Sequence, residues 1–303
     1  METGEELPID QLGEGVPNVV ALLVDLAVSK DKLFLIEEPE NDLHPKALKA
    51  LMDLIILSSK ANQFIISTHS NIVLRYLGAE PNAKIYEIRP MDRRQPPEAT
   101  VHLVEATPEA RLKVLRDLGY SFSDFDLWDG WLILEESSAE RIIRDYLIPW
   151  FVPKLTRIRT LAASGADDVE PRFVDFDRLT RFTHLEGAYK GAAWVRLDGD
   201  PKGSAIVDKL RVDYKDWPED RFACYSSDQF EIYFPAEFQE RIEVLIKKPS
   251  GKHKSDEKKS LLKNVLAWLD EDEERGKKAL EISAAEIIED LQKIEAQLLK
   301  KKQ

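Results

Sequence analysis

The sequence predicts an α/β protein in which two βα regions are followed by a charged helical tail. In the first third of the chain, apolar runs of strand length alternate with segments of helix length, and the same alternation returns after residue 130. From Glu237 onward the residues are charged, with apolar positions at helical spacing. These patterns divide the chain into a first region at 1–106, a helical connector at 107–129, a second region at 130–236 and a tail at 237–303.

Composition sets the broad class of protein. The chain has 303 residues, of which 43% are hydrophobic and 33% charged, so it can bury two compact cores or one core with an extension. Its single cysteine, Cys224, cannot form an internal disulfide. The opening METGEELPID lacks the features of a signal peptide, and no apolar run approaches the roughly 20 residues of a spanning helix. We therefore expect a cytoplasmic protein without membrane contact.

The charge of the chain is acidic overall and uneven along its length. A net charge of −13 argues against a protein that coats nucleic acid with its whole surface, although a local basic groove is compatible with it. Lysines gather between residues 247 and 263, and the chain ends in LLKKKQ. We interpret the first group as a solvated loop and the second as a frayed helix end, with phosphate contact as the alternative.

The first region predicts a parallel βαβ unit. A helix is expected at 16–29, followed by a buried strand at 32–38, a helix at 45–59 and another buried strand at 63–68. Two strands joined by such a helix pair in parallel with a right-handed crossover, and ligands gather at their carboxyl ends. Those ends carry Glu37, Glu38 and the segment STHS at 67–70.

The rest of the chain predicts a hairpin and a second βα pattern. Strands at 83–90 and 99–106 flank a turn rich in proline and charge. After the connector, strands are expected at 131–136, 156–163 and 192–198, with helices at 139–151, 173–185 and 204–214. The apolar stripe of 285–299 is expected to pack against the body of the protein or a second subunit.

Two acids at one strand end and a histidine at the next suit nucleotide hydrolysis. One carboxylate, Glu37, orients Mg²⁺ and its waters, Glu38 polarises the attacking water, and His69 senses the terminal phosphate. Upstream, Gly13 and Gly15 precede a helix whose N-terminus could face a phosphate. Taken singly, the acids could cap a strand and His69 could satisfy a core hydrogen bond, but the ordered set favours a nucleotide site.

Acids at the ends of two later strands suit a metal. Asp198 and Asp200 form D-x-D-x-x-G with Gly203, which directs oxygens toward a common point, although DGD is also a common turn. A further acid is available from Glu135 or Glu136, at the end of the strand at 131–136. The sequence therefore predicts a carboxylate metal site in the second region.

In this order, the first motifs resemble the C-terminal half of an ABC-type ATPase of the SMC and OLD (overcoming lysogenisation defect) kind. The resemblance implies that 12–15 is the signature loop, with Gly13 where serine is usual, and that Glu37 and Glu38 end the Walker B strand with His69 as switch histidine. No G-x-x-x-x-G-K-[ST] occurs in the chain, and GKHKS at 251–255 lacks its leading glycine and strand. The chain is similar to a truncated or split ATPase, which would bind ATP only with an N-terminal partner chain that supplies the Walker A lobe.

The later motifs resemble a Toprim domain, which in OLD-family proteins follows the ATPase. The resemblance implies Mg²⁺ or Mn²⁺ bound by Glu136, Glu140, Asp198 and Asp200, with Ser137 where glycine is usual. Taking Glu135 as the first ligand instead leaves no acid four residues later, so Glu136 is preferred. Glu231, in SSDQFEIYFP, is a further candidate ligand, with an exposed side chain on a half-buried strand as the equal alternative.

The two resemblances together imply an OLD-like nuclease that hydrolyses phosphodiester bonds in DNA, self-associates, and acts in defence against phage or foreign DNA. Two metal ions roughly 3.5–4 Å apart would activate water and stabilise the leaving oxygen. Two rival hypotheses remain. One is a non-enzymatic regulatory or assembly subunit with both sites degenerate. The other is an SMC-like DNA repair ATPase fragment whose acidic second domain binds a partner.

Overall fold

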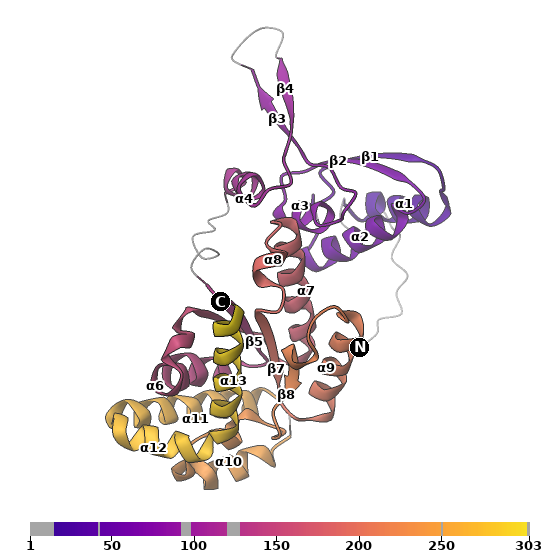
Figure 1. Cartoon of the computed structure of the whole chain (residues 1–303). Helices are drawn as coiled ribbons and strands as arrows, with labels where there is room; N and C mark the ends of the chain where they lie inside the picture. The colour runs from indigo at the N-terminus through magenta and orange to yellow at the C-terminus, as the bar shows by residue number, and fades with distance from the viewer. Residues whose placement is uncertain (1–14, 42, 92–97, 120–127, 250, 302–303) are drawn as a thin grey trace, which may run out of the picture. The chain divides into compact units, whose positions relative to one another are not determined.

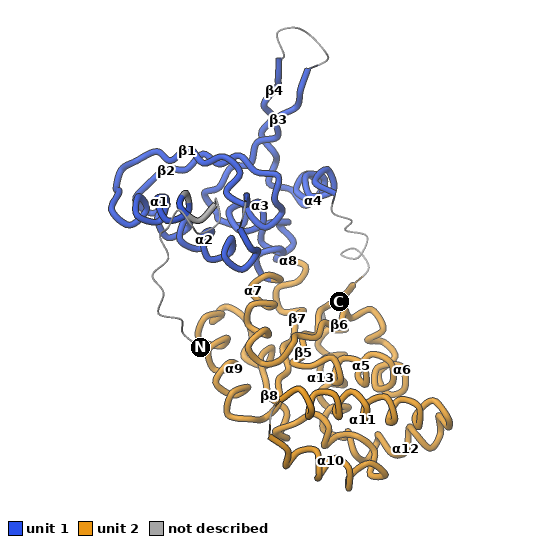
Figure 2. Tube along the Cα trace, turned by 180° about the vertical axis from the view of Figure 1, so that it is seen from behind, with its two compact units in different colours: residues 1–122, 177–186 blue, residues 123–176, 187–303 orange. Residues whose placement is uncertain are grey.

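A computed structural model describes residues 15–41, 43–91, 98–119, 128–249 and 251–301. The chain forms two compact units, coloured separately in Figure 2: unit 1 comprises residues 1–122 and 177–186, and unit 2 comprises 123–176 and 187–303. Both units contain parallel strands and helices, so the mixed α/β class is confirmed. No helix within the described ranges has the length and apolar character needed to cross a membrane.

Unit 1 begins with the βαβ unit that the sequence predicts. Its elements, labelled in Figure 1, are α1 (Gly15–Val28), β1 (Leu33–Glu37), α2 (Pro45–Ser58), β2 (Gln63–Ser67) and α3 (Asn71–Gly78). The strands pair in parallel, so that Glu37 stands opposite Ser67. Pro45, at the first position of α2, fixes the start of that helix. The Ser70 hydroxyl accepts a hydrogen bond from Ile72 N–H and fixes the start of α3.

The two strands are not fully buried, which corrects the expectation for both. Exposure alternates along each strand, and Leu33, Leu35 and Ile65 are 54%, 71% and 57% exposed. Phe34 and Phe64 lie on the other face, where their rings stack 5.0 Å apart, and Phe64 packs against the core of α2 and α3. The cause is that helices of the described chain cover one face of this sheet and leave the other to solvent.

The predicted hairpin and connector helix are also present in unit 1. Strand β3 (Tyr86–Pro90) pairs antiparallel with β4 (Ala99–Leu103), and α4 (Pro108–Asp117) follows. The centre of the hairpin turn, 92–97, and the later part of the connector, 120–127, lie outside the described residues. One face of the hairpin is apolar and exposed, and its members are Tyr86, Ile88, Val101 and Leu103.

Unit 2 is built on a four-stranded parallel sheet. Its order is β6–β5–β7–β8, where β5 is Gly130–Leu134, β6 is Ile158–Ala162, β7 is Ala193–Leu197 and β8 is Phe222–Cys224. Every residue of the central strands β5 and β7 is buried. The predicted helices correspond to α5 (Ser137–Ile142), a π-helical turn (Ile143–Leu147), α6 (Ile148–Phe151), α7 (Ala166–Phe182) and α9 (Pro201–Asp213) (Figure 2). Residues 177–182 at the end of α7 belong to unit 1. The short helix α8 (Glu186–Tyr189) and the strand β8 were not expected from the sequence.

The C-terminal region is helical, and its helices belong to the core of unit 2. They are α10 (Gln239–Ile246), α11 (Lys252–Glu271), α12 (Glu273–Ser283) and α13 (Ala285–Lys301). Residues of all four helices, such as Ile242, Val265, Leu280 and Leu291, share one apolar cluster with the strand residue Leu132. The apolar stripe of 285–299 therefore packs against the body of the same chain.

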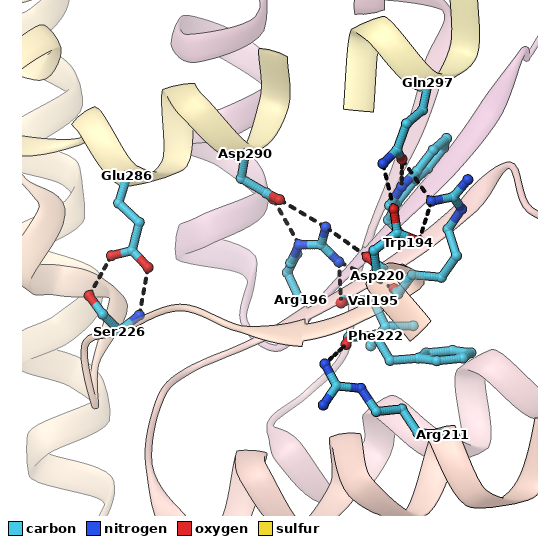
Figure 3. Close-up of polar contacts among 11 residues, drawn as sticks. Trp194, Val195, Arg196, Arg211, Asp220, Phe222, Ser226, Glu286, Asp290 and Gln297 are labelled. Atoms are coloured by element: carbon cyan, nitrogen blue, oxygen red, sulfur yellow. Dashed lines mark hydrogen bonds and ion pairs between the residues drawn. The ribbon is translucent and has the colours of Figure 1, made fainter. Parts of the chain in front are cut away.

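A buried ion pair joins the last helix to the sheet (Figure 3). Arg196, on β7, is buried, and its Nε and Nη2 atoms each lie 2.8 Å from a carboxylate oxygen of Asp290 on α13. The remaining donors of Arg196 reach backbone oxygens of residues 195, 220 and 221. Further along α13, Gln297 accepts hydrogen bonds from Trp194 and Arg221. Because a buried guanidinium is costly unless it is paired, this contact ties α13 to β7.

Replacing Asp290 by alanine is expected to destabilise unit 2, since it leaves the Arg196 charge buried without its partner. The expected loss in the free energy of unfolding is about 3–5 kcal/mol. The measurement is denaturant unfolding followed by tryptophan fluorescence. Glu289→Ala is the matched control, because Glu289 forms only an exposed pair with Lys293 on the same helix. Equal losses in the two variants would contradict this account of the pair.

Candidate functional site

The first candidate site lies at the carboxyl ends of β1 and β2. Glu37 is the last residue of β1, Glu38 follows it, and His69 stands two residues beyond β2. The parallel register brings these ends together, and Glu38 N–H donates a hydrogen bond of 2.9 Å to the Ser67 carbonyl. Of the other predicted nucleotide residues, Gly13 lies outside the described residues and Gly15 is the first residue of α1.

Glu38 has an unusual backbone and a well-held carboxylate. Its φ of 44° lies in the left-handed region of the backbone map. For a residue other than glycine, this conformation costs free energy on the order of 1–3 kcal/mol. Asn41 Nδ2 donates to Glu38 Oε2 at 2.9 Å, and His69 Nε2 lies 3.4 Å from Glu38 Oε1. The carboxylate of Glu38 therefore lies beside His69, and the action of the pair on one ligand stays a prediction.

Glu40 is a contributor to this site that the motif analysis did not assign. Its Oε1 accepts hydrogen bonds from the Thr68 hydroxyl at 2.7 Å and from His69 N–H at 2.8 Å. The contact fixes the loop after β2 against the loop after β1, and so places His69 near Glu38. A glutamate two residues after the strand-end pair was the signal available in the sequence.

The second candidate site lies at the carboxyl ends of β5 and β7. Asp198 follows β7 and is 7% exposed, and Asp200 accepts a 2.6 Å hydrogen bond from Gly203 N–H as the N-cap of α9. Both glycines of this motif stand where the backbone is crowded. A Cβ on Gly203 would lie 2.3 Å from the Asp198 carbonyl oxygen, and one on Gly199 would lie 2.4 Å from the Tyr225 carbonyl oxygen. The D-x-D-x-x-G spacing is therefore also a packing requirement.

The two glutamates after β5 have different partners. Glu135 Oε2 accepts a hydrogen bond of 3.2 Å from Asp198 N–H, which joins the ends of β5 and β7. Glu136 is directed toward Lys258, whose Nζ lies 3.2 Å from each of its carboxylate oxygens. The choice between Glu135 and Glu136 as metal ligand stays a prediction, because both lie at the same sheet end.

Glu231 is buried in a short 3₁₀ helix (Phe230–Tyr233) rather than exposed on a strand, which corrects the alternative given above. Its side chain is 1% exposed. Lys258 Nζ lies 3.1 Å from its Oε2 as an ion pair, yet within the described chain neither carboxylate oxygen has an aligned hydrogen-bond partner. A buried carboxylate in that state has capacity for a further cation.

Lys258 is the residue of this site that sequence analysis missed. The lysine-rich segment was interpreted as a solvated loop, but 252–271 form helix α11, and Lys258 is half-buried among the acids. Helical periodicity was the available signal, since Leu261, Val265 and Leu269 continue one face of this helix into the core.

Glu140 differs from the other predicted ligands in its contacts. Its Oε1 lies 2.8 Å from Arg144 Nη1 and accepts a 2.9 Å hydrogen bond from the Thr160 hydroxyl. Arg144, on the π-helical turn, compensates the charge of Glu140, and Thr160 contributes its hydrogen bond from β6. Ser137, which stands at the usual glycine position, is the first residue of α5.

Burial, together with repulsion between the carboxylates, raises the pKa of three of these acids. Burial raises the pKa of Asp198 from 3.8 to about 8, with added repulsion from Glu135 and Glu136. Burial also raises the pKa of Glu135 and Glu231, and Lys258 opposes both shifts. Burial works against the charge of Lys258, but Glu231 and Glu136 outweigh it and raise the lysine pKa.

These oxygens suit a hard divalent cation in kind, because Mg²⁺ and Mn²⁺ prefer carboxylates. The raised pKa of Asp198 indicates that little positive charge lies beside its carboxylate. As arranged, no three acidic, histidine or cysteine side chains among the described residues stand close enough together to hold a metal ion. Metal binding would therefore require the carboxylates to move toward one another.

One comparison with known proteins concerns the segment that contains the first site. Residues 1–75 match the sequence model of the family described as "AAA domain, putative AbiEii toxin, Type IV TA system". This segment, which contains Glu37, Glu38 and His69, is therefore similar to an AAA-type ATPase domain. No curated protein matches the chain.

One solved structure that matches is described as "Structural biochemistry of ATP-driven dimerization and DNA stimulated activation of SMC ATPases". It is 19% identical, with a TM-score of 0.30, and the match covers 39% of this chain and 69% of that one. A likeness at this level carries no argument about fold or function here.

The raised pKa of Asp198 predicts how the stability of the metal-free protein depends on pH. Between its ordinary pKa of 3.8 and its folded value of about 8, the folded state holds a proton that the unfolded chain has released. Stability from this group is therefore complete below pH 4 and is lost as pH rises toward 8. Asp198→Asn cannot ionise, so its stability relative to wild type should increase by at least about 1.4 kcal/mol between pH 5 and pH 8.

This prediction is measured by denaturant unfolding in EDTA at both pH values. Asp208→Asn, at an exposed position on α9, should follow wild type. Parallel pH profiles for Asp198→Asn and wild type would show that the Asp198 carboxylate is not held protonated.

Proposed function

We propose that this protein is an OLD-like, metal-dependent nuclease whose hydrolytic site lies at the ends of β5 and β7 and is Toprim-like. The observation that carries the proposal is the cluster of the buried Asp198 and Glu231 with the half-buried Glu135 and Glu136, and Asp200 beside it at the start of α9. Carboxylates with too little neutralising charge, at the carboxyl ends of parallel strands, are a typical environment for a catalytic metal.

In this proposal, Mg²⁺ or Mn²⁺ is held by Asp198, Asp200 and a glutamate after β5, with Glu231 and Glu140 as the further predicted ligands. A bound divalent ion supplies an activated water and neutralises charge on a phosphodiester. The chain's own part is to orient the carboxylates: Phe230 N–H donates to Asp198 Oδ2 at 3.3 Å, and Gly203 N–H holds Asp200. DNA is the proposed substrate, and defence against phage or foreign DNA is the proposed role.

Unit 1 is proposed to act as an incomplete nucleotide-responding component. The similarity of residues 1–75 to an AAA domain and the pairing of Glu38 with His69 support this part. The 303 residues contain no phosphate-binding loop, so a partner lobe would have to bring one. The solvent-exposed apolar face of β1 and β2 is consistent with such a partner or with self-association.

Two observations favour a second candidate, the non-enzymatic regulatory subunit. The ammonium group of Lys258 already neutralises Glu136 and Glu231, and Ser137 replaces the glycine that is usual after the first acid. A site of this kind could hold unit 2 together without binding metal.

A plasmid-nicking assay separates the two candidates. With Mg²⁺ or Mn²⁺, wild type should convert supercoiled DNA to nicked and linear forms, and Asp198→Ala should lower the rate at least about 100-fold, since it removes a charged metal ligand. Asp208→Ala is the control at an exposed acid of α9 and should keep the wild-type rate. Full activity in Asp198→Ala would exclude this site, and metal binding without cleavage of any DNA or RNA form would favour the regulatory subunit.

A turnover assay tests the ATPase component. The purified chain should hydrolyse millimolar ATP at a rate close to background, because Glu38 and His69 lack the lysine and backbone cradle that bind the phosphates. Robust turnover that disappears in Glu38→Gln, but persists in Glu105→Gln at an exposed position of unit 1, would show that the chain completes a nucleotide site by another route.

A further inference from the structure

The hairpin of unit 1 presents one apolar face to solvent. Strands β3 and β4 pair antiparallel, and every second residue of each strand lies on the same face. Three register pairs line this face: Tyr86 with Leu103, Ile88 with Val101, and Pro90 with Ala99. All six residues are exposed, and the central pair, Ile88 and Val101, is 67% and 63% exposed. A contiguous apolar surface of this kind marks an interaction site.

The hairpin is held at its base by the core of unit 1. Ile85, directly before β3, packs against a cluster that contains Leu115 and Phe182. Val104 N–H, directly after β4, donates a hydrogen bond of 2.9 Å to the Ile85 carbonyl. From this base the two strands extend away from helices α2 and α3 (Figures 1 and 2). Because a two-stranded hairpin is only marginally stable in water, a surface that covers its apolar face would stabilise it.

The size of this face matches what a pair of identical chains needs. A half-exposed tyrosine, leucine, isoleucine or valine side chain presents roughly 100 Å² of apolar surface. With Pro90 and Ala99 the face amounts to about 500 Å², so two hairpins packed face to face would bury about 1,000 Å², the lower limit for a specific interface. The exposed face of β1 and β2 offers only Leu33, Leu35 and Ile65. Two copies packed there would bury only about 600 Å².

The charges of the hairpin also favour a second copy of this chain. The ten residues of β3 and β4 contain one acid, Glu87, and one arginine, Arg89, and both lie on the face opposite the apolar one. The Arg89 guanidinium donates hydrogen bonds of 2.7 and 2.6 Å to the two oxygens of Glu87. The strands are therefore locally neutral although the chain carries a net charge of −13. Two hairpins can approach without like-charge repulsion, and the apolar face offers no cation to a phosphate.

We propose that the β3–β4 hairpins of two copies of this chain pack face to face about a two-fold axis, and that this contact makes the protein a dimer. In a two-fold contact the same surface serves on both copies, so each side chain at its centre is buried twice. Two apolar sheet faces pack about 10 Å apart with their side chains interdigitated. The inference concerns unit 1 and depends neither on the proposed metal site nor on nucleotide.

Sedimentation velocity of the full chain at micromolar concentrations, without nucleotide or added metal, measures this association. Wild type should form a dimer as its concentration rises. Ile88→Lys should raise the dissociation constant at least about 100-fold, because a charge replaces a central apolar side chain in both copies. His102→Lys is the matched control, since it adds a charge at an exposed position on the opposite face of β4, and it should dimerise like wild type.

Three results would overturn the inference. A wild-type chain that stays monomeric would leave the apolar face to a different protein. Ile88→Lys that associates as strongly as wild type would show that another surface holds the copies together. Equal losses in His102→Lys and Ile88→Lys would assign the effect to added charge and not to the apolar face.

A second variant keeps the test decisive if circular dichroism shows that Ile88→Lys does not fold. Val101→Thr keeps the β-branched shape that strands favour, but it replaces one methyl group by a hydroxyl. It should raise the dissociation constant about tenfold, because each of the two faces loses apolar contact. A folded Val101→Thr protein with wild-type affinity would contradict the proposed contact.

Discussion

The repulsion among buried carboxylates at the ends of β5 and β7 is the constraint on which the arrangement of unit 2 depends. Asp198 and Glu231 are almost inaccessible to water, and isolated charges there would be too costly to retain. The structure reduces that cost in three ways: a lysine from α11 approaches two of the acids, backbone N–H groups bond two others, and the pKa of Asp198 rises to about 8. A bound divalent ion would complete the neutralisation and convert a costly cluster into a reactive one.

The same constraint explains why the C-terminal helices are part of the core. Helix α11 carries Lys258, and α13 carries Glu286, which accepts hydrogen bonds from Ser226 and Tyr233 on either side of Glu231. The Arg196–Asp290 pair fixes α13 to the strand that ends in Asp198. The acids are thus positioned by helices that lie in a later part of the sequence. In unit 1, by contrast, helices cover one face of the sheet, and the other face is apolar and exposed to solvent.

Strand ends could be predicted from the sequence because the signal is local. An apolar run that breaks into acids located Glu38, Glu135, Glu136 and Asp198, and the following strand located His69. Lys258 and Glu231 could not be paired in this way, since Lys258 is 122 residues from Glu136 and no local pattern marks a cation that comes from a distant helix. The exposure of Leu35 and Ile65 was missed because an apolar run indicates a strand without showing what covers it. Strand β8 was missed because its three residues are too few for a pattern.

The most direct test of this account is the anomalous diffraction of crystals grown with Mn²⁺. The account predicts an anomalous peak at the carboxyl ends of β5 and β7, within coordination distance of Asp198 and a glutamate after β5, with the Lys258 ammonium group still between Glu136 and Glu231. Ordered carboxylates at this position without a peak, in crystals containing millimolar Mn²⁺, would contradict the claim that the cluster is a metal site.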